Sequence, residues 1–219
     1  MKLHYINDTL CGWCFVAHEQ ITTLFAKCPK DVTVQLYHRR LFHGGGEMTI
    51  SPSMLDMVRR VGQEIGPGRT GVRIDDAHIE FLKTPGLRYS SDLTARAFAV
   101  VQHLAPDHLF AFSTALQKSV FEIGLDFSSA DAIAECFAKV TGLDHDALLQ
   151  GLEAADLEDR VDENAALSAA MMSRVNSNGV PCLILEANGV FYELDPYDEA
   201  NALNDIMTLK AQMPHAFAE

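Results

Sequence analysis

Residues 7–20 read NDTLCGWCFVAHEQ and place two cysteines, Cys11 and Cys14, on either side of a Gly-Trp pair near the start of the chain. The C-x-x-C spacing occurs in zinc sites, structural disulfides, haem attachments and redox-active pairs. A haem attachment is excluded because it needs a histidine directly after the second cysteine, where this chain has Phe15. The rest of the sequence has to distinguish among the other three.

The remaining cysteines argue against a structural disulfide framework. Five cysteines is an odd number, and Cys28, Cys136 and Cys182 are scattered without a second close pair. A secreted disulfide-stabilised protein is expected to have a denser and even set. In a reducing compartment, a single C-x-x-C is more often catalytic or metal-binding.

Zinc is the main alternative to a redox pair. Cys14 and His18 are four residues apart, which brings them to one face of a helix, and Cys11 would supply a third ligand. No second C-x-x-C and no H-x-x-x-H follows in the sequence. We therefore predict a redox pair and no metal.

Composition and charge exclude several other classes of protein. The 219 residues are 48% hydrophobic and 21% charged, as in ordinary soluble globular proteins of one elaborated domain or two small ones. No run approaches the roughly 18 apolar residues of a membrane span, and His4 and Asp8 interrupt any signal peptide, so we expect a cytoplasmic protein. Residues 1–44 carry a net charge of +2 and residues 45–219 a net charge of −15, which disfavours nucleic acid as a partner.

The hydrophobic pattern predicts strand, helix, strand at the N-terminus, then a long helical segment, then a mixed C-terminal part. The cysteines fall at the turn from the first strand to the first helix. Asn188-Gly189 between two apolar runs is a strong hairpin signal. The expected strands cover 2–7, 31–40, 183–185 and 190–194; the expected helices cover 11–28, 51–65, 90–106, 107–124, 128–142, 156–177 and 198–213; the main expected loops are 41–48, 66–71 and 83–91.

Three stretches together resemble the DsbA-type branch of the thioredoxin superfamily: DTLCGWCF at 8–15, the helical run at 115–144, and NGVPCLIL at 178–185. The resemblance implies an α/β thioredoxin fold (βαβ…αββα) interrupted by an inserted all-helical domain. The N-terminal thioredoxin part would be residues 1–44, the insertion 45–155, and the C-terminal thioredoxin part 156–219. It also implies that Pro181 is a cis-proline facing the cysteines.

Within that family, the chain is similar to cytoplasmic DsbA-like proteins described as dithiol–disulfide isomerases, in which CGWC and a glycine-rich stretch like 43–46 recur. Two positions depart from the wider family. Tyr5 stands six residues before the first cysteine, where many thioredoxin-fold enzymes have a buried acid, and Cys182 follows the proline where DsbA relatives commonly have threonine. A proton acceptor for Cys14 would have to be water or another group, such as His4 or Asp8.

Disulfide exchange requires one accessible thiol that attacks and a second that resolves the mixed disulfide. We expect Cys11 to attack and Cys14 to resolve, and we expect the N-terminus of the helix to favour the thiolate of Cys11 and lower its pKa. Neither Gly12 nor Trp13 is a cation, whereas strongly oxidising relatives have a histidine between the cysteines. We therefore predict a weaker oxidant, closer to a reductase or an isomerase.

Trp13, the backbone of Val180, and Pro181 are the expected substrate-binding residues, because an extended substrate would pair with the chain beside the proline. Cys28 and Cys136 are expected to be inert thiols. For Cys182, a small buried hydrophobic residue in its strand is favoured over the alternative of a third thiol near the active pair. Residues 38–40 are expected to be a solvated strand end.

These features predict a thiol–disulfide oxidoreductase or isomerase that uses no bound cofactor. Its partners would be proteins or small molecules that contain thiols or disulfides, with glutathione among them, and no oligomeric state is predicted. One alternative is a DsbA-like adaptor or redox-sensing binding protein. A less favoured alternative is a glutathione-dependent isomerase or transferase on the same fold, whose known members generally lack one or both cysteines.

Overall fold

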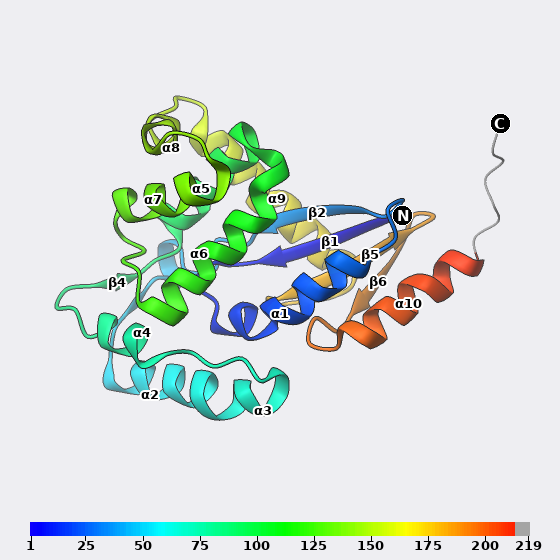
Figure 1. Cartoon of the computed structure of the whole chain (residues 1–219), viewed down its shortest axis with the longest axis horizontal. Helices are drawn as coiled ribbons and strands as arrows, with labels where there is room; N and C mark the ends of the chain where they lie inside the picture. Colours follow the sequence, from blue (N-terminus) through cyan, green and yellow to red (C-terminus); the bar gives the residue numbers. More distant parts are fainter. Residues whose placement is uncertain (213–219) are drawn as a thin grey trace.

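A four-stranded sheet forms the centre of the fold in a computed structural model, which describes residues 1–212 (Figure 1). The strand order is β2 (Thr33–His38), β1 (Lys2–Asn7), β5 (Cys182–Ala187) and β6 (Val190–Leu194). β1 and β2 are parallel, whereas β5 is antiparallel to both of its neighbours. Parallel neighbours need a crossover connection, and the helix that begins at the C-x-x-C motif provides it.

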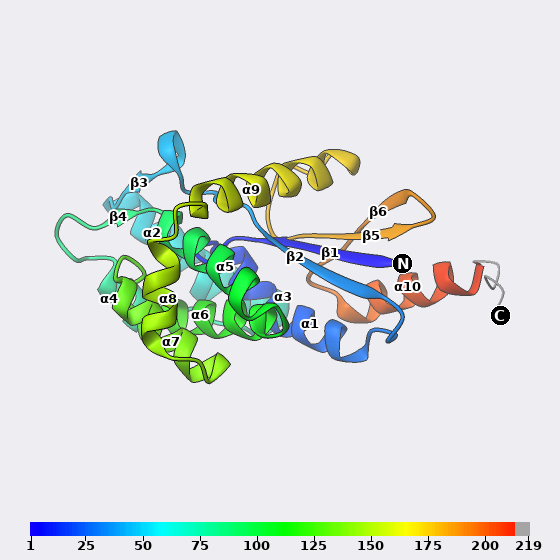
Figure 2. The same ribbon diagram turned by 90° about the horizontal axis from the view of Figure 1, so that it is seen from above.

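Helices cover both faces of this sheet because the strands bury side chains on both sides. Leu183 and Leu185 pack with α1 (Gly12–Lys27) and α10 (Glu199–Gln212), while Ile184 between them packs with α9 (Leu157–Arg174). Figure 2 shows α9 on one side of the strands and α1 and α10 on the other. This βαβ…αββα arrangement around a mixed sheet is the predicted thioredoxin fold.

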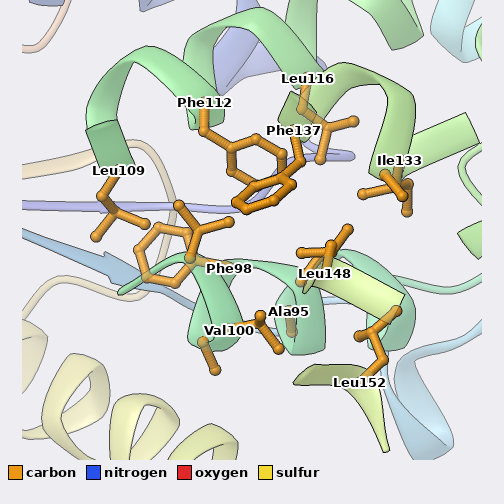
Figure 3. Packing of buried hydrophobic residues seen from close by; sticks show 14 of the residues in the cluster. Ala95, Phe98, Val100, Leu109, Phe112, Leu116, Ile133, Phe137, Leu148 and Leu152 are labelled. Carbon is orange, nitrogen blue, oxygen red and sulfur yellow. The ribbon is translucent and has the colours of Figure 1, made fainter. Parts of the chain in front are cut away.

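Helices of the segment between β2 and α9 share a hydrophobic core with β2 and the start of α9. Phe98, Phe112 and Phe137 meet at its centre, surrounded by leucine, isoleucine and valine side chains (Figure 3). The helices of this segment are α2 (Pro52–Arg60), α3 (Gly66–Thr70), α4 (Asp76–Phe81), α5 (Asp92–Leu104), α6 (Leu109–Ile123), α7 (Ala130–Thr141) and α8 (His145–Leu152), with a π-helical turn at Val61–Ile65 between α2 and α3.

Two expectations about this segment are wrong. It is not all-helical, because β3 (Met48–Thr49) pairs with β4 (Arg88–Tyr89) in a small antiparallel ladder. Residues 66–71, expected to be a loop, are largely the helix α3: Pro67 lies in its first turn, where proline is tolerated, and a left-handed Gly71 ends it.

The other expected strands and helices are present, with ends that shift by a few residues. The predicted end of the last helix, Met213, lies outside the described residues. The division of the chain at residues 44 and 155 into a thioredoxin part and an insertion stays a prediction. Within residues 1–212, no helix is long and apolar enough to cross a membrane.

Candidate active site

Cys11 is the N-cap of α1, so its side chain lies where the first backbone N–H groups of the helix have no partner within the helix. Its own N–H donates to the carbonyl of Asp8 at 3.1 Å, and its carbonyl accepts from the N–H of Phe15 at 3.1 Å. These two bonds hold the strand-to-helix turn. The positive end of the helix dipole therefore points at the Cys11 thiol, as the sequence predicted.

Cys14 lies one turn further along α1 and is completely buried, whereas Cys11 is 6% exposed. We expected an openly exposed attacking thiol; Cys11 is nearly covered because it faces a pocket rather than the open surface. All five cysteines are free thiols in this structure. Burial, together with a hydrogen bond to Cys11, raises the pKa of the Cys14 thiol well above its usual value.

The Val180–Pro181 peptide bond is cis, as predicted. The Cys11 thiol donates a hydrogen bond to the carbonyl oxygen of Val180 at 3.5 Å. The two motifs singled out in the sequence, CGWC and GVPC, are thus in direct contact. The roles predicted for Val180 and Pro181 in binding a substrate stay predictions.

Trp13 lies partly exposed at the rim of the site. Its ring meets Tyr197 edge-on, with ring centroids 6.2 Å apart, and the guanidinium of Arg69 stacks over the same tyrosine at 3.8 Å. Trp13 also lines the pocket beside Cys11. It is therefore placed where it could contact a group bound at the cysteine.

Tyr5 occupies the position of the usual buried acid and lies by the cysteine pair. Its hydroxyl is buried and has no hydrogen-bond partner. Burial first, and then the neighbouring Cys14 and Cys11, raise the pKa of Tyr5 well above its usual value. The hydroxyl therefore stays protonated and cannot serve as the missing base.

Of the two candidate proton acceptors, only Asp8 lies at the cysteines. Its buried carboxylate accepts from the N–H of Leu10 at 2.8 Å and from the N–H of Leu41 at 2.7 Å, and its charge contributes to the raised pKa of Cys14. His4 instead contacts the hydroxyl of Tyr37 at 3.2 Å and the carboxylate of Glu186 at 3.0 Å. His4 is therefore occupied elsewhere in the fold.

The end of β2 is not solvated, contrary to expectation. The buried His38 ring accepts a hydrogen bond from the N–H of Thr9 at 3.2 Å. Arg40, whose side chain is only 10% exposed, forms ion pairs with Asp92 at 2.8 Å and Asp162 at 3.3 Å. His38 thereby supports the turn that leads to Cys11, and Arg40 is paired within the fold, whereas Arg39 is partly exposed.

The remaining cysteines lie away from the pair. Cys182 packs between the sheet and α9, on the face of the sheet opposite α1, and burial raises its pKa to about 11. Burial also raises the pKa of Cys136 and of the partly buried Cys28. All three are expected to react slowly as nucleophiles.

The His18 ring, which the zinc alternative would need as a ligand, makes contacts with Phe15 instead. Its Nδ1–H donates to the carbonyl of Phe15 at 2.6 Å, and the ring stacks on that of Phe15. Among residues 1–212, no three His, Cys, Asp or Glu side chains are grouped to hold a metal ion.

A pocket of about 270 Å³ opens beside Cys11, and sequence reasoning missed it. Its walls come from the turn before α1, the loop after β2, α2, the π-helical turn and the chain before Pro181. The only signal in the sequence was three methionines within ten residues. The lining residues are Leu10, Cys11, Gly12, Trp13, Leu41, Phe42, Met48, Met54, Met57, Val58, Val61, Ile74, Tyr89, Phe121, Gly179 and Val180.

A thioredoxin fold with an inserted helical segment, in which a C-x-x-C helix start contacts a cis-proline loop, defines the class of DsbA-like thiol–disulfide oxidoreductases. Sequence comparison agrees: the profile of the DSBA-like thioredoxin domain matches residues 4–203. The chain belongs to this family, which confirms the predicted family, fold and class of enzyme. Among curated protein sequences, none matches the chain.

Solved structures show the same fold at low sequence identity. The cytosolic disulfide reductase DsbM from Pseudomonas aeruginosa is 20% identical, with 97% of this chain and 98% of that chain covered and a TM-score of 0.78. The same protein with GSH is 18% identical over 97% and 98% of the two chains, with a TM-score of 0.77. A probable DsbA oxidoreductase from Streptomyces coelicolor is 15% identical over 100% and 94%, with a TM-score of 0.70.

Proposed function

We propose that Cys11 and Cys14 exchange disulfides with thiol- or disulfide-containing substrates. In the reducing direction, the Cys11 thiolate attacks one sulfur of a substrate disulfide, forms a mixed disulfide and releases the first substrate thiol. Cys14 then loses its proton and attacks the Sγ of Cys11, which releases the second thiol. Two electrons pass to the substrate and a Cys11–Cys14 disulfide is left. Oxidation of a substrate is the reverse sequence.

One observation carries this proposal: the Cys11 thiol lies at the start of α1, against the Val180 carbonyl and facing a pocket, while the Cys14 thiol one turn further along the helix is completely buried. The first thiol can meet a substrate, and the second can reach only the first. This asymmetry is what attack followed by resolution requires. It supports Cys11 as the attacking group and Cys14 as the resolving group.

Trp13, Val180 and Pro181 are proposed to position the substrate. The Val180 carbonyl is already used by the Cys11 thiol, and it is released when that sulfur enters a mixed disulfide. A substrate in extended conformation would then find a free backbone acceptor next to the new S–S bond. Trp13 supplies an aromatic surface at the rim.

The surroundings of the pair favour the reducing or isomerising direction. Gly12 and Trp13 bring no cation to the thiolate, and burial raises the pKa of the Cys14 thiol. Both features disfavour thiolates, and a less stabilised dithiol form is a better reductant. A cytoplasmic location fits this direction, and a small thiol such as glutathione is the proposed source of electrons for the next cycle.

The test is reduction of insulin disulfides by purified variants. Cys11→Ser should abolish reduction, and Cys14→Ser should accumulate substrate bound through Cys11 as a mixed disulfide. Cys136→Ser, at a buried cysteine away from the site, is the matched control and should retain activity. Equal rates of insulin reduction by Cys11→Ser and by the unchanged protein would contradict the proposal. Partner capture that survives serine at both positions would favour the adaptor alternative.

A further inference from the structure

The strand β6 forms one edge of the central sheet (Figure 1). Within residues 1–212, β5 is the only strand that pairs with it. The pairing has no bulge, and β6 contains neither proline nor lysine; its one charged residue is Glu193. Native proteins use prolines, lysines and bulges to keep an exposed edge from pairing with another chain. The β6 edge lacks these features and is open to a further strand.

The hairpin turn at 188–189 determines which backbone groups of β6 face outward. Both turn residues have positive φ, as in a two-residue hairpin turn, so the residues on either side form the hydrogen-bonded pair that closes it. Hydrogen bonding alternates along an antiparallel pair of strands. Phe191 and Glu193 therefore direct their N–H and C=O groups away from β5, towards the open edge.

The side chains of β6 are also exposed on both faces of the sheet. On the face covered by α10, Val190 is 49% and Tyr192 37% exposed. On the face covered by α9, the guanidinium of Arg174 lies 5.3 Å from the centre of the Phe191 ring, and Glu193 is exposed. Neither Arg174 nor Glu193 forms an ion pair with another of the residues 1–212.

This edge is complementary to itself. In a two-fold antiparallel pairing centred on Tyr192, Phe191 of one copy lies directly opposite Glu193 of the other. Both residues have outward backbone groups, so they exchange N–H···O=C hydrogen bonds. Side chains at directly opposite positions have β-carbons about 5 Å apart. Glu193 of each copy therefore lies beside the Phe191 ring of the other copy, within reach of the Arg174 guanidinium stacked on that ring.

Charge also favours this approach of two copies. The chain has a net charge of −13, so two copies repel each other over most of their surfaces. The helix α10 lies beside β6 on the Tyr192 face, and its most exposed residues carry no charge (Figure 2). These residues are Ala200, Asn201, Asn204, Met207, Thr208, Ala211 and Gln212.

From these observations we propose that a second copy of the chain docks on β6, so that the two central sheets join into one continuous sheet across a two-fold axis. Two contacts between Glu193 of one copy and Arg174 of the other hold the register. The proposal is independent of disulfide exchange. Cys11 follows β1, and β5 separates β1 from β6, so the second copy leaves the active site open.

Analytical ultracentrifugation of the full chain tests the proposal, with a reducing agent present to exclude dimers joined through cysteines. The unchanged protein should sediment as a dimer. Glu193→Arg and Arg174→Glu each place like charges against each other at both contacts, so each should raise the dissociation constant of the dimer about tenfold or more. Glu64→Arg is the matched control: Glu64 is exposed in the π-helical turn, and the same change of charge there should leave the dissociation constant unchanged.

A mixture of Glu193→Arg and Arg174→Glu separates a contact between copies from one within a chain. In the mixed dimer, each position 193 faces a position 174 of opposite charge. The mixture should therefore dimerise about as well as the unchanged protein, although each variant alone does not. An ion pair within one chain would give no such rescue.

Tyr192→Lys is an independent variant, because it places two lysines beside each other at the two-fold axis. It should separate the dimer even if a charge-reversal variant fails to fold, which circular dichroism would detect. A monomer at every concentration up to about 1 mM, the range of very weak complexes, would overturn the proposal. A dimer that Tyr192→Lys does not weaken, or a mixture of folded variants without rescue, would also overturn it.

Discussion

The Sγ of Cys11 lies 3.5 Å from the carbonyl oxygen of Val180, although 169 positions separate the two residues in the chain. Sheet pairing explains the contact, because β1 ends just before Cys11 and β5 begins just after Val180, and Ile6 pairs with Cys182 across the antiparallel ladder. The contact between the C-x-x-C turn and the cis-proline loop is therefore assembled from segments near opposite ends of the chain.

The raised pKa of Cys14 predicts that resolution of the mixed disulfide depends on pH. Burial, the largest cause of the raised pKa of Cys14, persists when Cys11 is held in a mixed disulfide, so the Cys14 thiol is mostly protonated at neutral pH and its thiolate fraction grows about tenfold per pH unit below its pKa. The rate at which a mixed disulfide at Cys11 is resolved should therefore rise steeply from pH 7 to pH 9. Rapid acid quenching followed by mass spectrometry measures this rate. A rate independent of pH would contradict the assignment.

Asp8 is predicted to hold the active-site turn in place. Asp8→Ala would leave the N–H groups of Leu10 and Leu41 without an acceptor, and should lower the free energy of unfolding by about 2–5 kcal/mol. Urea denaturation measures the change. Asp126→Ala is the control: Asp126 is exposed and accepts from the N–H of Ser128 at 2.9 Å, so its removal should cost much less. Equal losses would show that burial of Asp8 has no special effect.

Tyr5→Phe should leave the exchange rate unchanged and should not destabilise the fold. The hydroxyl is buried without a hydrogen-bond partner, so its removal relieves an unsatisfied group and can raise the free energy of unfolding by about 1 kcal/mol. Insulin reduction and thermal denaturation test both points. A rate loss of about a hundredfold, the size typical of removing a general acid or base, would instead assign Tyr5 a part in proton transfer.

The lowered pKa of the buried His78 predicts that the protein loses stability in mild acid. Burial lowers its pKa to about 4 from the usual 6.5, against a smaller opposite effect from the backbone of Val120. Below pH 6.5 the His78 side chain is protonated in the unfolded chain but stays neutral in the folded state. The free energy of unfolding therefore falls as the pH drops from 6.5 towards 4. Between pH 8 and pH 5 this group should account for about 2 kcal/mol. His78→Leu should reduce the loss by that amount in urea denaturation, and identical pH profiles would contradict the prediction.

The sequence predicted the thioredoxin part well because its signals are local. The apolar run in β1, the alternation in β2 and Asn188-Gly189 at the hairpin each specify a nearby structure, and the resemblance to DsbA-type proteins supplied the cis-proline at Pro181. The contact between the C-x-x-C turn and the cis-proline loop follows once β1 and β5 are neighbours in the sheet.

The sequence did not predict features that depend on distant packing. Gly66 and Pro67 read as a loop, yet the chain stays helical there, and a β-carbon on Gly66 would lie 2.7 Å from the Cγ2 of Val16. Gly66 therefore allows close packing on α1, which no local pattern reveals. The pocket was missed for the same reason, because its walls come from segments far apart in the sequence.

The most direct test of the central claim is to equilibrate the protein with reduced and oxidised glutathione and to map the disulfides by mass spectrometry. We expect one reversible, two-electron disulfide between Cys11 and Cys14, with the thiols of Cys28, Cys136 and Cys182 still free. Redox titration of that disulfide should give a potential at or below the cytosolic glutathione poise, as for a reductant. Failure to form a Cys11–Cys14 disulfide at any ratio of oxidised to reduced glutathione would contradict disulfide exchange at this pair.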